Sequence, residues 1–358
     1  MSVHEILIAV MAGFAAIGAV DRILGNKLGL GKEFEDGIMA MGSLAMAMLG
    51  IISLAPVLAA VLRPMVVPVY AFLGADPAMF AGTILACDMG GGSLAQEMTA
   101  DPQAALLGGV ICGSMLGATI VFTIPVAMGI LREEDRPALA KGILAGLVTI
   151  PVGTLVGGLV AGFPVGMVLR NLIPVVVIAV LIALGLWKAE KAMITGFGWF
   201  GKGITALITV GLAAAIVEEL TGFVLIPGLT PLEEGFQTVG AIAIVLAGAF
   251  PLVAVLTRVL KKPLMKLGHL LGINDTAAAG LVATLANSIA TFGLVKDMDQ
   301  RGKVVNIAFA VSAAFVFGDH LGFTAGFAPE MLPAVILGKL AGGISAVAVA
   351  LFLTRKEE

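Results

Sequence analysis

Charged residues are scarce in this sequence. Asp, Glu, Lys and Arg make up only 13% of it, against about 25% in a soluble domain, while 59% of the residues are hydrophobic. The mean hydropathy is +1.08. No polar stretch is long enough for a separate soluble domain, and a formal net charge of −3 argues against nucleic-acid binding. These absences predict an integral membrane protein.

Cysteine and histidine are also rare. Cys87 and Cys112 lack CxxC spacing, and His4, His269 and His320 are scattered along the chain. We therefore expect no disulfide framework, no metal site and no resident cofactor. The first 20 residues have neither a basic segment nor a small-residue cleavage site, so they are expected to be a first membrane span instead of a removed signal peptide.

Long apolar runs are what the sequence does contain. A helix needs about 20 apolar residues to cross a bilayer. These runs lack the alternation that is typical of barrel strands, which favours helices. The predicted class is an all-α polytopic membrane protein. The charge-free runs are 37–62, 103–131, 142–169, 235–257 and 276–295.

A two-fold internal repeat is indicated by matches at a constant offset of 198 residues. The predicted units are 1–162 and 199–358, with 163–198 as a linking span and loop. Because Ala, Gly, Leu and Val are so common here, the rarer matches carry the most weight. They include Glu35 with Glu233, Ser114 with Ser312 and Lys141 with Lys339.

Basic residues in short loops predict the orientation of the spans. The loop after the first span carries Arg22, Lys27 and Lys32, whereas its counterpart at 220–235 has none, which predicts inverted repeats with the N terminus outside. Arg355 and Lys356 place the C terminus inside. The nine predicted spans are 5–24, 36–62, 104–131, 138–162, 165–187, 203–220, 236–257, 303–327 and 331–353.

Two segments do not fit as ordinary spans. Residues 76–96 contain "ACDMGGGSLAQEM" and residues 275–295 contain "ATLANSIATFG", so each is polar or glycine-rich in its middle. This pattern is typical of re-entrant hairpins or broken helices. The 198-residue offset also pairs 119–122 with 317–320, inside "AFVFGDHLGFTAGF". We therefore expect four helix breaks to meet near the midplane of the membrane.

Carboxylates in such spans usually mark a substrate or ion path, because their burial is costly. Asp88 and Asp319 are the candidates to bind a cation, and His320 is suited to tune or relay protons. Neutral contacts are expected from Asn287, Ser288, Thr119 and Ser93. Glycines expected at the breaks are Gly90, Gly91, Gly92, Gly318 and Gly322, and aromatic faces are expected from Phe122, Phe292 and Phe317.

Each candidate also has a structural alternative. The alternative for Asp88 is that it caps the N terminus of a half-helix. The alternative for Asp319 and His320 is that they form a locked pair that holds a bend. Asn287 is equally suited to join two helices. The phenylalanines are mostly expected to pack against lipid or protein.

The chain resembles the bacterial ethanolamine permeases of the EutH family. The resemblance covers nearly the whole chain and rests on "EDGIMAMGSLAMAMLG", "LAPVLAAVLRPMVVPVYAFLGADPAMFAGTILACDMGG", "AAAGLVATLANSIATFGLVKDMDQRGKVVNIAFAVSAAFVFGDHLGF" and "GKLAGG". It implies a multi-pass inner-membrane permease that admits ethanolamine, and no enzymatic activity. Gly92 and Ser288 stand where the family pattern favours Phe and Asn.

The implied substrate matches the candidate residues. Ethanolamine is mostly an ammonium ion at neutral pH, so Asp88 or Asp319 would hold its charge, and Asn287, Ser288 or Thr119 its hydroxyl. We expect alternating access in which the hairpins and broken spans move against 5–62 and 203–257. The alternatives are a channel-like facilitator, a Na⁺- or H⁺-coupled symporter of another small solute, and an intramembrane enzyme, which lacks a convincing nucleophile. The sequence leaves homo-oligomerisation open.

Overall fold

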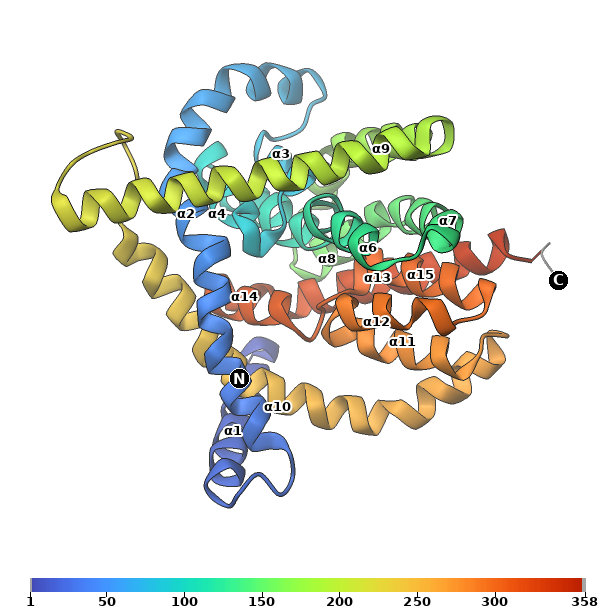
Figure 1. The fold of residues 1–358 in the computed structure, drawn as a ribbon. Coiled ribbons are helices and arrows are strands. Elements are labelled where there is room, and N and C mark those ends of the chain that lie inside the picture. The colour runs from blue at the N-terminus through green and yellow to red at the C-terminus, as the bar shows by residue number, and fades with distance from the viewer. Residues whose placement is uncertain (1, 356–358) are drawn as a thin grey trace.

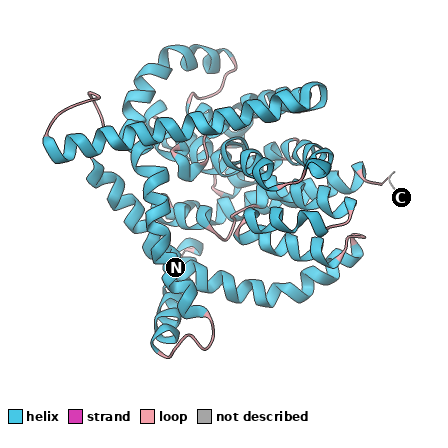
Figure 2. Ribbon diagram, in the orientation of Figure 1, coloured by secondary structure: helices cyan, strands magenta, loops and turns pink. Residues whose placement is uncertain are grey.

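The computed structural model describes residues 2–355, and within this range it contains helices and loops but no strand (Figure 2). Eight of these helical segments are long and apolar enough to cross a membrane. The all-α polytopic class is therefore confirmed. Lys356, which contributed to the predicted location of the C terminus, lies outside the described residues.

The eight candidate membrane helices coincide with eight of the nine predicted spans. Three are assembled from consecutive shorter helices, and α9 is interrupted at Ala189, where the backbone leaves the helical region (φ −144°, ψ 48°). The segments are α1 (Val3–Ile23), α2 (Leu30–Phe72), Pro102–Ile130 with α5 (Pro102–Ala105) and α6 (Ile124–Ile130), Glu133–Val160 with α7 (Arg136–Leu147) and α8 (Ile150–Val160), the two parts of α9 (Val165–Thr221), α10 (Leu232–Leu270), and Pro329–Leu353 with α15 (Leu332–Leu353).

The ninth predicted span, 303–327, is interrupted, which agrees with the helix break expected at 317–320; the residues between the two helices are 314–318. It consists of α13 (Gln300–Ala313) and α14 (Asp319–Phe327), separated by an irregular segment in which Phe315 has a φ of 62°. Backbone N–H groups in this break donate to carbonyls of another segment: Phe315 to Thr284 (3.2 Å) and Phe317 to Leu285 (2.9 Å). These bonds satisfy the donors that the broken helix leaves free.

The prediction of a helix break at 119–122 was wrong. The chain is helical through this region, with π-helices at Leu106–Gly117 and Thr119–Thr123 followed by α6 (Ile124–Ile130). A Cβ on Gly117 would lie 1.8 Å from the carbonyl oxygen of Leu85, so only glycine allows this close approach of the two backbones. The widened helix is therefore packed directly against the first interrupted segment.

Both segments predicted to be interrupted are pairs of short helices, which confirms that part of the prediction. At about 1.5 Å per residue, helices of 7 to 12 residues do not cross a bilayer core of about 30 Å. In the second pair, Thr291 joins the two helices by hydrogen bonds to Thr284 (2.8 Å) and to the carbonyl of Gly280 (3.0 Å). The first hairpin contains α3 (Ala78–Ile84), a turn at Cys87–Met89 and α4 (Gly91–Met98), and the second contains α11 (Asp275–Ala286) and α12 (Ser288–Leu294).

The helices form two groups. In the first, the scaffold group, α2 packs against α1, α10 and the 191–221 part of α9. In the second, the hairpin group, α7, α8, α13 and α15 pack together with the two hairpins and 102–130. Figure 1 shows α9 across the upper part of the molecule and α10 running from the left side into its lower part, with α13 and α15 between them. The groups meet where α2 and α10 contact α4, α11 and α14.

Candidate functional site

A cavity of about 220 Å³ lies between the scaffold group and the hairpin group. This is room for several water molecules or one small solute. The scaffold contributes α2, and the hairpin group contributes the first hairpin turn, the π-helical region and the break before α14. The residues that line the cavity are Ser43, Leu44, Ala47, Ala86, Asp88, Met89, Ala118, Phe122, Phe315, Asp319 and His320.

Three ionisable side chains from three segments form a chain of contacts at this cavity. His320 Nε2 lies 3.6 Å from Asp88 Oδ1, and His320 Nδ1 lies 3.0 Å from Lys339 Nζ. Lys339 also donates to the carbonyl oxygen of Ser114, at 2.5 Å. The structure therefore brings the predicted residues Asp88, Asp319 and His320 together in the lining of one cavity.

Lys339 was not predicted as a site residue, although it is only 1% exposed and contacts His320 directly. The sequence did contain an indication of this role, because Lys339 is a cation within the apolar helix α15 (Leu332–Leu353). An ionisable residue inside a membrane span is a functional candidate by default.

Asp319 faces a second cavity as well. This cavity, of about 470 Å³, extends from Asp319 to the exposed Arg258 on α10. Within residues 2–355, the Asp319 side chain makes no hydrogen bond or ion pair, whereas Asp88 has His320 Nε2 at 3.6 Å from its Oδ1. The lining residues are Glu33, Phe250, Val253, Ala254, Thr257, Arg258, Ala286, Asn287, Phe317, Gly318 and Asp319.

The second hairpin turn lies at the second cavity. Asn287 lines it, and its Oδ1 accepts a hydrogen bond from the N–H of Ile289 (2.7 Å) as the N-cap of α12. Its amide nitrogen makes no hydrogen bond to the described residues. Ser288 is fully buried and its Oγ has no partner among the described residues. Phe317, predicted as an aromatic contact, also lines this cavity.

Four predicted contacts line neither cavity, and Ser288 is one of them. The hydroxyl of Thr119 lies 2.7 Å from the carbonyl oxygen of Met115 and 3.0 Å from that of Val311, so it joins the π-helical region to α13. Ser93 is half-buried on α4, and Phe292 is fully buried on α12. The structure therefore places these residues behind the cavity walls.

Aromatic rings cover one side of the smaller cavity. Phe122 and Phe315 pack edge to face with ring centroids 5.3 Å apart, and Phe315 lies 5.3 Å from the His320 ring. Phe122 was predicted and Phe315 was missed. A positive φ at phenylalanine has no signature in the sequence, because the tertiary hydrogen bonds of the break impose it.

Glycines shape both breaks. Gly90 has a φ of 93° and ends the first hairpin turn, and a Cβ there would lie 2.2 Å from Ile51. A Cβ on Gly318 would lie 2.2 Å from the carbonyl oxygen of Ala286, which is backbone and has little room to move. The remaining predicted glycines also lie in close contacts: Gly91 beside Ala86, Gly92 beside Phe323 and Phe327, and Gly322 beside Leu246.

The structure brings together three residues that have metal-binding side chains. Ligand atoms of Cys87, Asp88 and His320 lie within 4.8 Å of one another. No motif in the sequence indicated this cluster, because His320 is distant along the chain from Cys87 and Asp88. The Lys339 ammonium already contacts the Nδ1 of His320, and a cation in that position disfavours a metal ion beside it.

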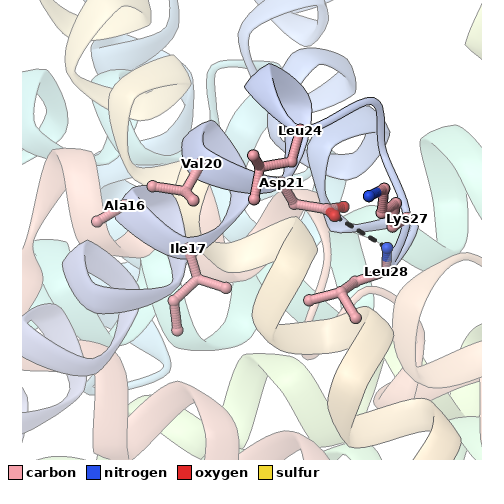
Figure 3. A pocket seen from close by; sticks show the side chains of 7 residues that line it. All are labelled: Ala16, Ile17, Val20, Asp21, Leu24, Lys27 and Leu28. Carbon is pink, nitrogen blue, oxygen red and sulfur yellow. Dashed lines mark hydrogen bonds between the residues drawn. The ribbon is translucent and has the colours of Figure 1, made fainter.

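A larger cavity of about 510 Å³ lies apart from these residues, at the end of α1 (Figure 3). Its lining is mostly apolar, and its carboxylate, Asp21, already accepts hydrogen bonds from the N–H groups of Leu28, Leu30 and Gly31, each at 2.9 Å. Asp21 therefore holds the loop between α1 and α2 and is not available to a ligand.

The sequence of this chain matches one known protein family over nearly its whole length. Residues 3–353 match the family described as "Ethanolamine utilisation protein, EutH". The chain belongs to the EutH family. This confirms the resemblance, and with the apolar helices it supports the assignment as a multi-pass membrane protein of ethanolamine utilisation.

Relatives in three bacteria are similar over nearly their whole length. The chain is 59% identical to the probable ethanolamine permease EutH of Listeria monocytogenes, over 99% of this chain and 95% of the relative. It is 50% identical to the probable ethanolamine permease EutH of Salmonella typhimurium, over 100% and 97%. It is 54% identical to the uncharacterized protein YxeR of Bacillus subtilis, over 99% and 96%. No solved structure matches the chain.

Proposed function

We propose that this protein is a secondary transporter that imports ethanolamine across the bacterial inner membrane and is not an enzyme. The names of its EutH relatives support the substrate. The structural observation that carries the proposal is that one carboxylate, Asp319, faces two cavities, one that lies between the helix groups and one that extends to the exposed Arg258. A substrate held at Asp319 has a binding chamber on one side and a route of release on the other.

The chemistry of these cavities fits a small amino alcohol. Asp88 and Asp319 supply negative charge, and the rings of Phe122 and Phe315 offer aromatic faces, which attract an ammonium ion. The amide of Asn287 is positioned to bind a hydroxyl on the side of the second cavity. A carboxylate, an aromatic wall and a neutral polar group together match the two ends of ethanolamine.

Inverted repeats form part of the proposal, and the helix boundaries support them. At the 198-residue offset, the end of α2 at Phe72 corresponds to the end of α10 at Leu270, and the first hairpin corresponds to the second. The units 1–162 and 199–358 then place the hairpins on opposite sides of the membrane. Arg258 donates to the carbonyl oxygen of Leu28 (2.8 Å), so two basic regions lie on one side, which we assign to the cytoplasm. The N terminus is then outside and the C terminus inside.

Alternating access is proposed to occur between the two helix groups. The binding chamber lies at their junction, because α2 lines it on one side and the hairpin group on the other. A shift of the hairpin group against α2 and α10 would change which side of Asp319 is open. The coupling is proposed to use Na⁺ or H⁺, with a carboxylate in the chamber as the group that senses the ion.

Reconstituted protein is expected to take up labelled ethanolamine with saturation and to show counterflow. A carrier binds substrate on each side in turn, so unlabelled ethanolamine trapped inside the vesicles should accelerate entry of the label. Uptake into proteoliposomes under separate Na⁺ and proton gradients measures both rate and coupling. Linear uptake without counterflow would contradict the carrier and favour a pore, and empty liposomes are the control.

Dependence of growth on this protein is expected to rise as the external pH falls. The neutral amine crosses a bilayer unaided, whereas the ammonium form does not, and acid makes the neutral form scarce. Growth on ethanolamine should be compared between a strain that expresses the protein and a deletion strain, from alkaline to acid medium. An equal growth defect at every pH would contradict this expectation, and growth on a second nitrogen source is the control.

A further inference from the structure

The two carboxylates of the smaller cavity differ in their partners. Asp88 lies 3.6 Å from His320, which contacts Lys339 at 3.0 Å, so a buried cation is joined to it through one imidazole ring. Asp319 makes no hydrogen bond or ion pair within the described part of the chain, although it lines both cavities. One acid therefore has a resident cation nearby, and the other does not.

The contacts of Lys339 determine which nitrogen of His320 faces Asp88 as a donor. An ammonium Nζ can only donate, so Nδ1 is the acceptor and the proton of a neutral imidazole is on Nε2. Nε2 lies 3.6 Å from Asp88 Oδ1. The carbonyl of Ser114, at 2.5 Å, holds Lys339 in this position. The chain of contacts runs from a cation to a carboxylate through a neutral ring.

We propose that Asp319 is the carboxylate that binds the substrate ammonium, and that Lys339, acting through His320, neutralises Asp88 and positions it. The inference rests on the proposed function of this cavity. An ammonium ion at Asp88 would meet a second cation one imidazole away, whereas Asp319 lies where both cavities meet. Lys339 is a positioning residue, because it lines neither cavity.

The arrangement has a definite charge balance. With Asp88 negative, His320 neutral and Lys339 positive, the internal chain has no net charge, and Asp319 gives the empty chamber a single negative charge. Ethanolamine brings one positive charge, so the loaded chamber is neutral. A neutral loaded chamber is the state that moves through low-dielectric surroundings at least cost.

The test is binding of labelled ethanolamine to the purified, detergent-solubilised protein. Asp319→Asn is expected to weaken binding at least about 30-fold, the scale of a lost charged hydrogen bond in a buried site. Asp88→Asn is expected to weaken it about tenfold, because the Lys339 charge is then unbalanced and repels the ammonium. Lys202→Met, which removes an exposed cation next to Trp199, is the matched control and should bind as wild type.

The double variant Asp88→Asn with Lys339→Met distinguishes the role of Asp88 from that of Asp319. It removes one charge of each sign from the internal chain, so binding is expected to recover to within about threefold of wild type. Asp319→Asn with Lys339→Met should show no recovery, because Asp319 is not balanced by that lysine. Lys339→Gln, which keeps donors for Ser114 and His320, is expected to preserve the order of His320 better than Lys339→Met.

Two results would overturn the inference. One is wild-type binding by Asp319→Asn, and the other is recovery of Asp319→Asn by Lys339→Met with no recovery of Asp88→Asn. Melting temperatures measured for all variants identify any that fail to fold, and for these the carboxylates are compared as Asp88→Ser and Asp319→Ser. If wild type binds no ethanolamine while remaining folded, the proposed function itself is wrong, which is a different outcome.

Discussion

Replacing Gly318 by valine is expected to reduce ethanolamine uptake at least about 100-fold. A Cβ at this position would lie 2.2 Å from the carbonyl oxygen of Ala286, so either the second hairpin or the break before α14 must move. Asp319 directly follows Gly318, Asn287 directly follows Ala286, and both line the second cavity. A displacement of about 1 Å at a site of this kind lowers activity about 100-fold. The measurement is initial uptake into proteoliposomes, normalised to the amount of folded protein.

Gly293→Ala is the matched control for this substitution. Gly293 lies on α12 of the same hairpin, and a Cβ there would meet no atom within 4 Å. Alanine is also a better helix former than glycine by about 1 kcal/mol, so uptake and melting temperature should stay at or above the wild-type values. Wild-type uptake by Gly318→Val would show that the close contact at the break does not position the site.

Lys303→Met is expected to destabilise the protein by about 3–5 kcal/mol, because it leaves a buried carboxylate without its cation. Lys303 on α13 donates to Asp135 at 2.5 Å, and the two side chains are only 9% and 1% exposed. The other oxygen of Asp135 has no partner among the described residues, so Lys303 is its main source of compensation. The measurement is the midpoint of thermal unfolding in detergent.

A double variant distinguishes the unpaired charge from lost packing. Lys303→Met with Asp135→Leu removes both charges and should recover most of the stability, since apolar replacement of a buried pair is often neutral or stabilising. Lys32→Met breaks the exposed pair with Asp36 and should change stability by less than about 1 kcal/mol. An equal loss of stability in the single and double variants would contradict the electrostatic explanation.

The local properties of the chain were sufficient to predict the class and most of the helices. Hydropathy is local, because each span must bury about 20 residues in lipid whatever its neighbours are. Eight predicted spans and both interrupted segments therefore correspond to helices in the structure. The family was predicted from long motifs such as the one that contains Asp88, and the match over residues 3–353 confirms it.

The candidate site could be predicted only in part. Asp88, Asp319 and His320 were recognised because ionisable groups in apolar runs are costly, and they meet at one cavity. Thr119 was expected at the cavity from the repeat offset, but its hydroxyl bonds to two backbone carbonyls instead. Single residues reveal their polarity in the sequence, but not the direction in which they point.

By itself, the sequence determined that this is a helical membrane protein of the EutH family with two interrupted segments, since those properties depend on runs of neighbouring residues. Only the tertiary structure decided that the break before Asp319 is held by the second hairpin and that Lys339 joins His320. The break exists because carbonyls of Thr284 and Leu285 satisfy its backbone donors. Contacts between residues far apart in the chain, which no local pattern specifies, therefore decided how the site is built.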